Sequence, residues 1–226
     1  MVYDGKVFPL DINGNSLSDF IRSLVDKAHG IFYYSVLYDV ERETFLRLGI
    51  HSGDMLKSAL LQKPWNDFRY GQSFFWSSDT PSGFADALFQ AFAGNDRLTI
   101  DALIAHFPYV PSEKIRQTLA LDNRFMHVRE GSYGLTSSIQ LDNDECAENA
   151  RAILAEVAGK GFCSLKQYMF PRSLELNGDV ERSAIETKFY RQYLMQSCDR
   201  HNTFSVVSAI SRRWVDILTS GSGTPA

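Results

Sequence analysis

RLTIDALIAHFPYVPSEKIRQTLALDNRFMHVREGSYGLT, residues 97–136, is the stretch of this sequence that predicts its fold most clearly. Thr99 can cap a first helix, in which apolar residues recur every three or four positions until Pro108 ends it. Pro111 is tolerated in the first turn of a second helix, which again carries its apolar residues on one face. These signals predict two short helices joined by a tight turn.

After the second helix the period of the sequence changes to two, which is typical of strands. Residues 125–129 alternate in this way, and residues 132–135 continue the alternation. We predict a three-residue loop over 129–131 with Gly131 in the left-handed conformation, because Glu130 disfavours the positive φ that a tight two-residue turn requires. The segment therefore predicts a helix-turn-helix followed by a β-hairpin. A helical hairpin beside an unrelated β-hairpin is the alternative.

Two short motifs in this segment resemble a known family. Leu119 to Phe125 has the pattern L-x-x-D-x-R-F, and Gly131 to Leu135 has the pattern G-x-Y-G-L. Together they resemble winged helix-turn-helix modules of the HARE type, which occur in the delta subunit of bacterial RNA polymerase, in restriction-linked proteins and in chromatin regulators. The resemblance covers about forty residues and implies a winged-helix fold in a DNA-associated context.

The N-terminal region shows helix and strand signals in a similar order. Residues 31–48 fit a helical face better than strict alternation, although 31–34 alone could be a strand. Residues 52–62 form a second amphipathic segment, and 68–76 alternate as in a hairpin. We expect a first winged helix over about 31–78 with 52–62 in the position of the recognition helix, on the basis of element order and not of a detected sequence repeat. A helical subdomain that packs against the central module is the alternative.

The turn cluster at residues 79–83 is the best internal boundary. We expect an N-terminal module over 1–80, a central winged-helix module over 81–140 and a mainly helical module over 141–226. The fold class is predicted as α+β, mainly α, with tandem winged-helix-like modules, small β-hairpins as wings and a helical C-terminal region. A third, degenerate winged helix is an alternative for the last module.

Within the last module the acidic residues that begin at Asp142 favour the first turn of a helix running to Gly159. Residues 162–170 are expected to form a short helix that ends at Pro171. Asp179 is expected to cap a long helix to about Cys198. Residues 204–218 are apolar enough for a final helix or a helix-strand mixture, and residues 220–226 are expected to be a flexible tail.

The composition and the net charge of the chain limit the classes of function that it can have. The chain has 226 residues, 44% of them hydrophobic, which is typical of a folded globular protein. Its net charge of −4 is unusual for a protein that neutralises phosphates, but residues 96–140 carry five basic and five acidic residues. DNA binding is therefore expected to be weak, local or shared with a protein partner. Three widely spaced cysteines, no apolar run long enough for a membrane span and no signal peptide favour the cytoplasm.

Motifs for catalysis or for a bound metal are missing from the sequence. Cys198 and His201 form one C-x-x-H pair, but a structural zinc site needs a second pair of ligands. His29, His51, His106 and His127 stand singly and are predicted to be ordinary helix-end or strand residues. We therefore predict a non-enzymatic protein with no cofactor and no metal. A nuclease assembled from scattered carboxylates is a distant alternative.

The second helix and the hairpin supply the candidate binding residues. If Ile115 and Leu119 face the core, the polar residues between them point outward and the hairpin is flanked by arginines. Lysine and arginine would bind the phosphates of double-stranded DNA, and Arg116 or Gln117 could read a base edge. The predicted DNA-binding residues are Ser112, Lys114, Arg116, Gln117, Arg124 and Arg129. The alternative is a protein-protein adaptor, which would present an apolar patch in place of clustered basic residues.

Overall fold

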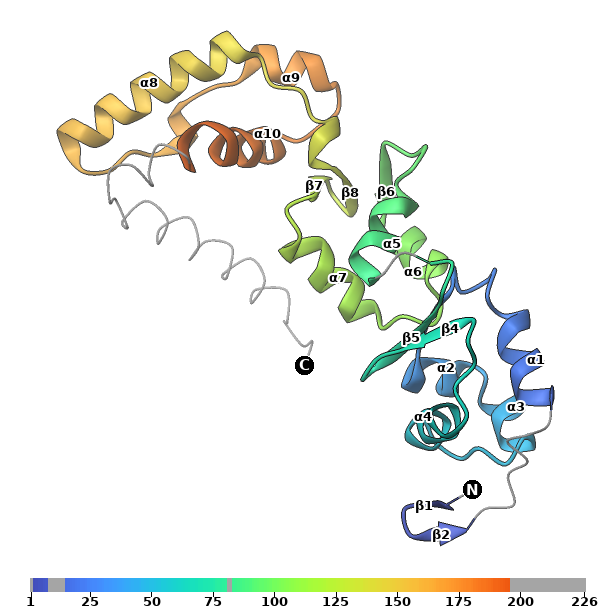
Figure 1. Cartoon of the computed structure of the whole chain (residues 1–226). Coiled ribbons are helices and arrows are strands. Elements are labelled where there is room, and N and C mark those ends of the chain that lie inside the picture. Colours follow the sequence, from blue (N-terminus) through green and yellow to red (C-terminus); the bar gives the residue numbers. More distant parts are fainter. Residues whose placement is uncertain (1, 8–14, 81–82, 196–226) are drawn as a thin grey trace, which may run out of the picture. The chain divides into compact units, whose positions relative to one another are not determined.

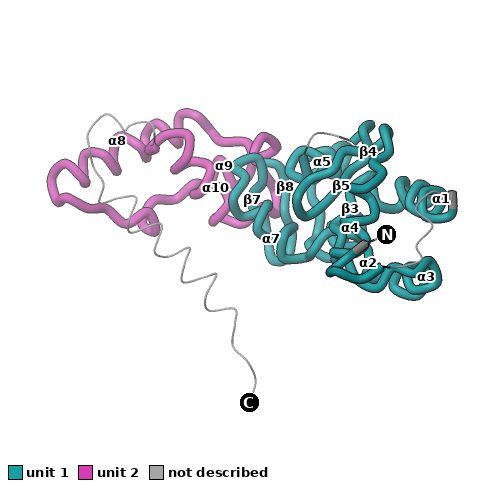
Figure 2. The backbone as a smooth tube through the Cα atoms, turned by 60° about the horizontal axis from the view of Figure 1, so that its bottom comes forward, with its two compact units in different colours: residues 1–135 teal, residues 136–226 magenta. Residues whose placement is uncertain are grey.

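The computed structural model describes residues 2–7, 15–80 and 83–195. The chain divides into two compact units, residues 1–135 and residues 136–226 (Figure 2). The class is α+β and mainly helical. Unit 1 contains two small three-stranded antiparallel sheets, whereas the described part of unit 2 contains helices and no strand.

Unit 1 is built from two successive sets of helices and strands (Figure 1). A short hairpin of β1 (Val2–Tyr3) and β2 (Lys6–Val7) precedes them. The first module, residues 15–80, contains α1 (Asn15–Ser23), β3 (Ile31–Tyr33), α2 (Tyr34–Val40), α3 (Arg42–Arg47), α4 (Gly53–Gln62), β4 (Phe68–Tyr70) and β5 (Phe74–Ser77). The second module, residues 83–135, contains α5 (Phe84–Ala91), β6 (Arg97–Thr99), α6 (Ile100–His106), α7 (Ser112–Leu121), β7 (Phe125–Arg129) and β8 (Ser132–Leu135).

Apart from α3, the two modules have the same element order: helix, strand, helix, helix, strand, strand. Their sheets also have the same strand order, β3-β5-β4 and β6-β8-β7, so that the first strand of each module pairs with the third. The strand over 31–33 in place of a continuous helix over 31–48 follows from this pairing, because Ile31 and Tyr33 lie opposite Trp76 and Phe74 on β5.

Side-chain caps begin two of the helices in unit 1, and the sequence predicts the one at Thr99. Thr99 accepts a hydrogen bond from the backbone N–H of Ala102 (3.1 Å) and begins α6. Ser52 accepts the corresponding bond from Met55 (3.0 Å) and begins α4. Each cap satisfies one of the donors that a helix leaves unpaired at its N-terminus.

The hairpin of the second module has the predicted strands but a shorter loop. Gly131 adopts the expected left-handed conformation, with φ of +66°. The three-residue loop is wrong, because Arg129 pairs with Ser132 and leaves only Glu130 and Gly131 between the strands. The strand register shifts between His127 and Arg129, so that Val128 between them has no opposite residue on β8. Glu130 does not adopt a positive φ in this loop.

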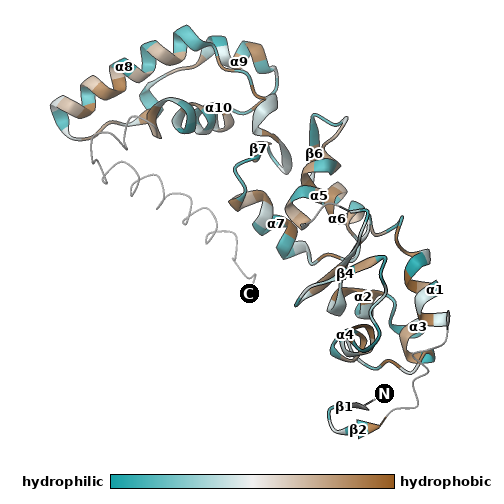
Figure 3. Ribbon diagram, in the orientation of Figure 1, coloured by the Kyte–Doolittle hydropathy of each residue, from teal (hydrophilic) through white to brown (hydrophobic). Residues whose placement is uncertain are grey.

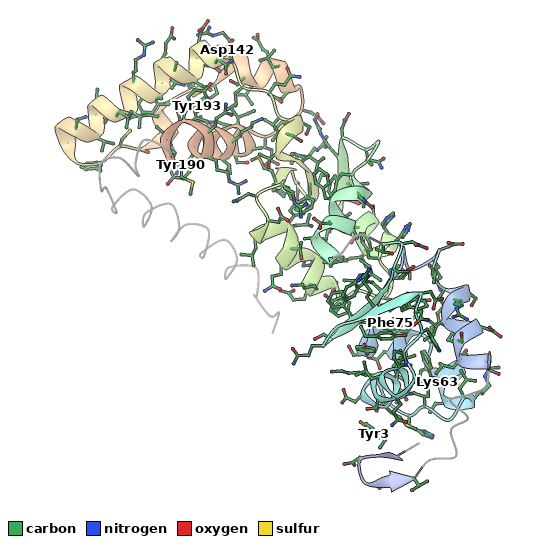
Figure 4. The ribbon with its side chains drawn as sticks, in the orientation of Figure 1. Tyr3, Lys63, Phe75, Asp142, Tyr190 and Tyr193 are labelled. Carbon is green, nitrogen blue, oxygen red and sulfur yellow. The ribbon has the colours of Figure 1, made fainter. Side chains whose placement is uncertain are left out.

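Each module has its own hydrophobic core, and each core includes at least one side chain from the other module. Figure 4 shows Phe75 among the side chains of the first module, where its ring stacks on Phe32 with the centroids 4.9 Å apart. Tyr109, from the turn between α6 and α7, is buried in this first core, whereas Tyr33 of β3 belongs to the second. The backbone N–H of Tyr33 also donates to the carbonyl of Tyr109 (3.0 Å). The helix-turn-helix of the second module is thereby packed against the first.

Unit 2 is a small helical unit with its own buried residues. Its elements are the 3-10 turn η1 (Thr136–Ser138), α8 (Asn143–Lys160), the 3-10 turn η2 (Leu165–Gln167), α9 (Pro171–Asn177), α10 (Arg182–Phe189) and the π-helical turn η3 (Tyr190–Leu194). Figure 3 shows hydrophobic residues alternating with hydrophilic ones along α8, as expected for a helix with one apolar face. Asp142 caps α8 by accepting a hydrogen bond from Glu145 N–H (2.8 Å), and Gly161 follows its end at φ of +76°.

Two predictions for this unit were wrong. Pro171 does not end a helix over 162–170 but begins α9, because a proline has no N–H to lose in a first turn. Asp179 does not cap the next helix. Val180 is buried, and Glu181, which has an extended backbone, is the residue that precedes the start of α10 at Arg182. Cys198, His201 and the predicted helix over 204–218 lie outside the described residues.

Candidate functional site

Helix α7 is fixed in the second module by its apolar face. Ile115, Thr118 and Leu119 are buried, and Ile115 and Leu119 belong to the core of this module. The hydroxyl of Thr118 donates to the carbonyl of Lys114 within the helix (2.8 Å), so the polar atom of this buried side chain is satisfied. The predicted orientation of Ile115 and Leu119 is therefore confirmed.

The predicted binding residues of α7 lie on the opposite side of the helix. Ser112, Arg116 and Gln117 are exposed, and Lys114 is half-buried. The ammonium group of Lys114 donates to the side-chain carbonyl of Gln117 (3.4 Å), which brings the two side chains together on the surface. This face offers a guanidinium, an ammonium, an amide and a hydroxyl to a ligand.

Arg124 has a structural role that the sequence did not predict. Its guanidinium donates to Asp122 through Nε (3.0 Å) and Nη2 (2.7 Å), and Nη1 donates to Asp86 of α5 (2.7 Å). These bonds, with Asp122 the larger cause, raise the pKa of Arg124 above its ordinary value, and the same pairing lowers the pKa of Asp122. The guanidinium also lies over the rings of Phe89 and Phe125.

Arg124 therefore ties α5 to the start of β7, and its charge is compensated by two carboxylates. Part of this could have been predicted, because Asp122 stands two residues before Arg124 and accepts its backbone N–H in an Asx turn (2.9 Å). The partner Asp86 lies 38 residues away in the sequence, and no local signal connects them. Arg129 is exposed at the end of β7, beside the hairpin loop.

In the first module, helix α4 has the position in the element order that α7 has in the second module. Helices α4 and α7 each have ten residues, and Lys57 is the fifth residue of α4 as Arg116 is the fifth of α7. Lys57 is half-buried, with its ammonium 6.0 Å from the centre of the Tyr34 ring. The face of α4 therefore carries a cation at the equivalent place, but a less accessible one.

A polar cleft of about 430 Å³ lies between the two modules of unit 1. His29, from the turn after α1, and His106, the last residue of α6, line it with their rings stacked, 3.6 Å apart at 14°. Burial, and to a lesser extent the neighbouring His29, lowers the pKa of His106. The sequence shows these histidines only as single residues, and the fold brings them together.

The described residues hold no group of three or more His, Cys, Asp or Glu side chains arranged to bind a metal ion. In the same residues, no helix has both the length and the hydropathy that crossing a membrane requires. Comparisons of this chain with protein-family models, with curated proteins and with solved structures gave no match.

Proposed function

We propose that the two modules of unit 1 are tandem winged helices and that the protein is a non-enzymatic, DNA-associated component that binds duplex DNA through α7. The proposal rests on the shared element order and on the first-to-third strand pairing in both sheets. In this arrangement the last helix before the hairpin is the one that enters a groove, and the hairpin is the wing. The assignment applies to α7 with β7–β8 and to α4 with β4–β5.

The chemistry of the α7 face supports the proposal. Arg116 is exposed on the helix and Arg129 is exposed on the hairpin, and arginine is a residue that commonly contacts phosphate. Gln117, one residue further, carries the amide that can pair with a base edge. Arg124 is left out of the contact set, because Asp86 and Asp122 hold its guanidinium.

With few cations on this face, we expect weak binding that falls steeply as the salt concentration rises. Each phosphate contact contributes a slope of about −0.9 to the plot of log K against log salt concentration. We expect binding to a duplex at roughly 50 mM salt, where surface electrostatics are exaggerated. Replacing Arg116→Glu together with Arg129→Glu should abolish this binding without unfolding the protein, because exposed charges contribute little to stability.

A matched control separates local contacts from net charge. Arg151 and Lys166 are exposed in unit 2, and Arg151→Glu with Lys166→Glu changes the net charge by the same amount. Fluorescence anisotropy with a labelled duplex should show that the control pair retains most of the affinity. Equal loss in both double variants would show that binding depends on overall charge and not on α7.

The second candidate function is a protein-protein adaptor on the same fold. The observation that favours it is Leu121, at the end of α7, a residue that is 73% exposed. Phe89 of α5 is also exposed, and the net charge of the chain is negative. If the wild-type chain binds no duplex at roughly 50 mM salt, the DNA proposal fails and the adaptor replaces it.

A further inference from the structure

The stacked histidines lie where the two modules of unit 1 meet, and the backbone holds His29 in place. His29 is a non-glycine residue with φ of +45°, a conformation that side chains rarely adopt without surrounding constraint. The next residue, Gly30, has φ of +71°, and a Cβ there would lie 1.9 Å from Thr80 Oγ1. The carbonyl of Gly30 also accepts from Ser77 N–H (2.8 Å). His29 is therefore attached to the sheet of the first module.

His106 belongs to the second module. It is the last residue of α6, and its ring lies edge-on to Phe107, which is buried in the core of the second module. The turn that follows places Tyr109 in the core of the first module. Each ring belongs to a different module, so the stack is a contact between the two modules of unit 1.

We propose that the His29–His106 pair is a pH-sensitive latch, which holds the two modules of unit 1 together while at most one ring is protonated and releases them when both rings carry a proton. An imidazolium can stack on a neutral imidazole, but two parallel imidazolium rings at this separation repel each other. The second proton therefore binds better to an open form in which the rings are apart. The open form takes up one proton more than the closed form.

The pH range of the latch depends on the ionisable groups at the cleft. Asp79, from the turn after β5, is the remaining ionisable residue that lines it. Gln90 and Asn95 line it with neutral amides. Because burial, and to a lesser extent His29, lowers the pKa of His106, this ring stays neutral at neutral pH, so the latch is closed there and weakens as the pH falls into the acidic range. His29 is exposed, so solvent screens part of the repulsion.

Hydrogen exchange of two backbone amides tests the latch. The Tyr33 N–H bonds across the modules to Tyr109, whereas the Ile50 N–H bonds to Phe45 within the first module (2.9 Å). Between pH 7.5 and 5, after correction for intrinsic exchange rates, protection of the Tyr33 amide should fall by up to about tenfold per pH unit. Protection of Ile50 should stay constant over the same range.

Variants decide between the latch and general acid destabilisation. In His29→Gln with His106→Gln the protection of the Tyr33 amide should no longer depend on pH. In His29→Gln alone, the NMR titration of His106 should move to higher pH, because a neighbouring charge is removed. A constant Tyr33 protection in the wild type, a parallel loss at Ile50, or an unchanged pH dependence in the double variant would each overturn the proposal.

Discussion

Tyr109 is the residue through which the two modules of unit 1 are most directly connected. It belongs to the turn of the second module, yet its ring is fully buried in the first core and stacks on Phe32. Its hydroxyl donates to Glu41 Oε1 (2.6 Å), and Lys27 lies 3.5 Å from the same oxygen. Burial and the bond to Glu41 together raise the pKa of Tyr109. One side chain thus combines apolar burial with a charge-assisted hydrogen bond.

Substitution of Tyr109 should separate these two contributions. Tyr109→Ala should lower the free energy of unfolding by about 3–5 kcal/mol, because it leaves a cavity of aromatic size. Tyr109→Phe should cost about 1–2 kcal/mol, since only the bond to the Glu41 carboxylate is lost. Urea denaturation of both variants measures the difference. A double-mutant cycle of Tyr109→Phe with Glu41→Ala is the control, and a coupling energy near zero would contradict the role of the hydrogen bond.

At the scale of elements, the start of α9 depends on a side chain from α8. Glu145 is only 5% exposed, and its two oxygens accept from the backbone N–H groups of Arg172 and Ser173 (2.9 Å each). The Ser173 hydroxyl donates to the same carboxylate (2.6 Å). A carboxylate at the positive end of a helix is stabilising, and here it replaces a cap from the chain that precedes Pro171.

Glu145→Gln should destabilise unit 2 by about 1–3 kcal/mol, because an amide nitrogen cannot accept the N–H that an oxygen now accepts. Glu148→Gln is the matched control on the same helix. The side chain of Glu148 is 65% exposed and lies 3.5 Å from Arg172, so its loss should change stability by less than about 1 kcal/mol. Thermal unfolding followed by circular dichroism gives both values. Equal losses of stability in the two variants would show that the buried hydrogen bonds of Glu145 contribute no more than the exposed ion pair of Glu148.

At the scale of the whole molecule, the two compact units have separate sets of buried residues. The cores of unit 1 are aromatic-rich and lie within residues 17–125. In the described part of unit 2, the buried residues, such as Cys146, Ile185 and Phe189, lie within residues 139–194. A unit with its own core can unfold by itself.

Calorimetry should therefore show two transitions. Tyr109→Ala should lower the melting temperature of one and leave the other unchanged, while Glu145→Gln should do the reverse. The reason is that each substitution removes contacts inside a single unit, and distant sites behave additively. A single transition that shifts with either substitution would contradict independent unfolding of the units.

The sequence by itself determined several local features of the second module. The Thr99 cap, the apolar face of α7, the strands of the hairpin and the left-handed Gly131 are confirmed, because each depends on residues only a few positions apart. The DNA-binding role of Ser112, Lys114, Arg116, Gln117 and Arg129 stays a prediction, and for Arg124 the structure shows two ion pairs instead of a free charge.

Only the tertiary structure decided how distant segments meet. The partner of Arg124, the position of Tyr109 in the first core, the cap of α9 by Glu145 and the stack of His29 on His106 all join residues far apart in the chain. Hydrophobic periodicity and capping signals report on a residue's immediate neighbours, so they carry no information about these pairs. Such contacts are fixed by the packing of whole elements, which brings side chains together only after the helices and sheets have formed their cores.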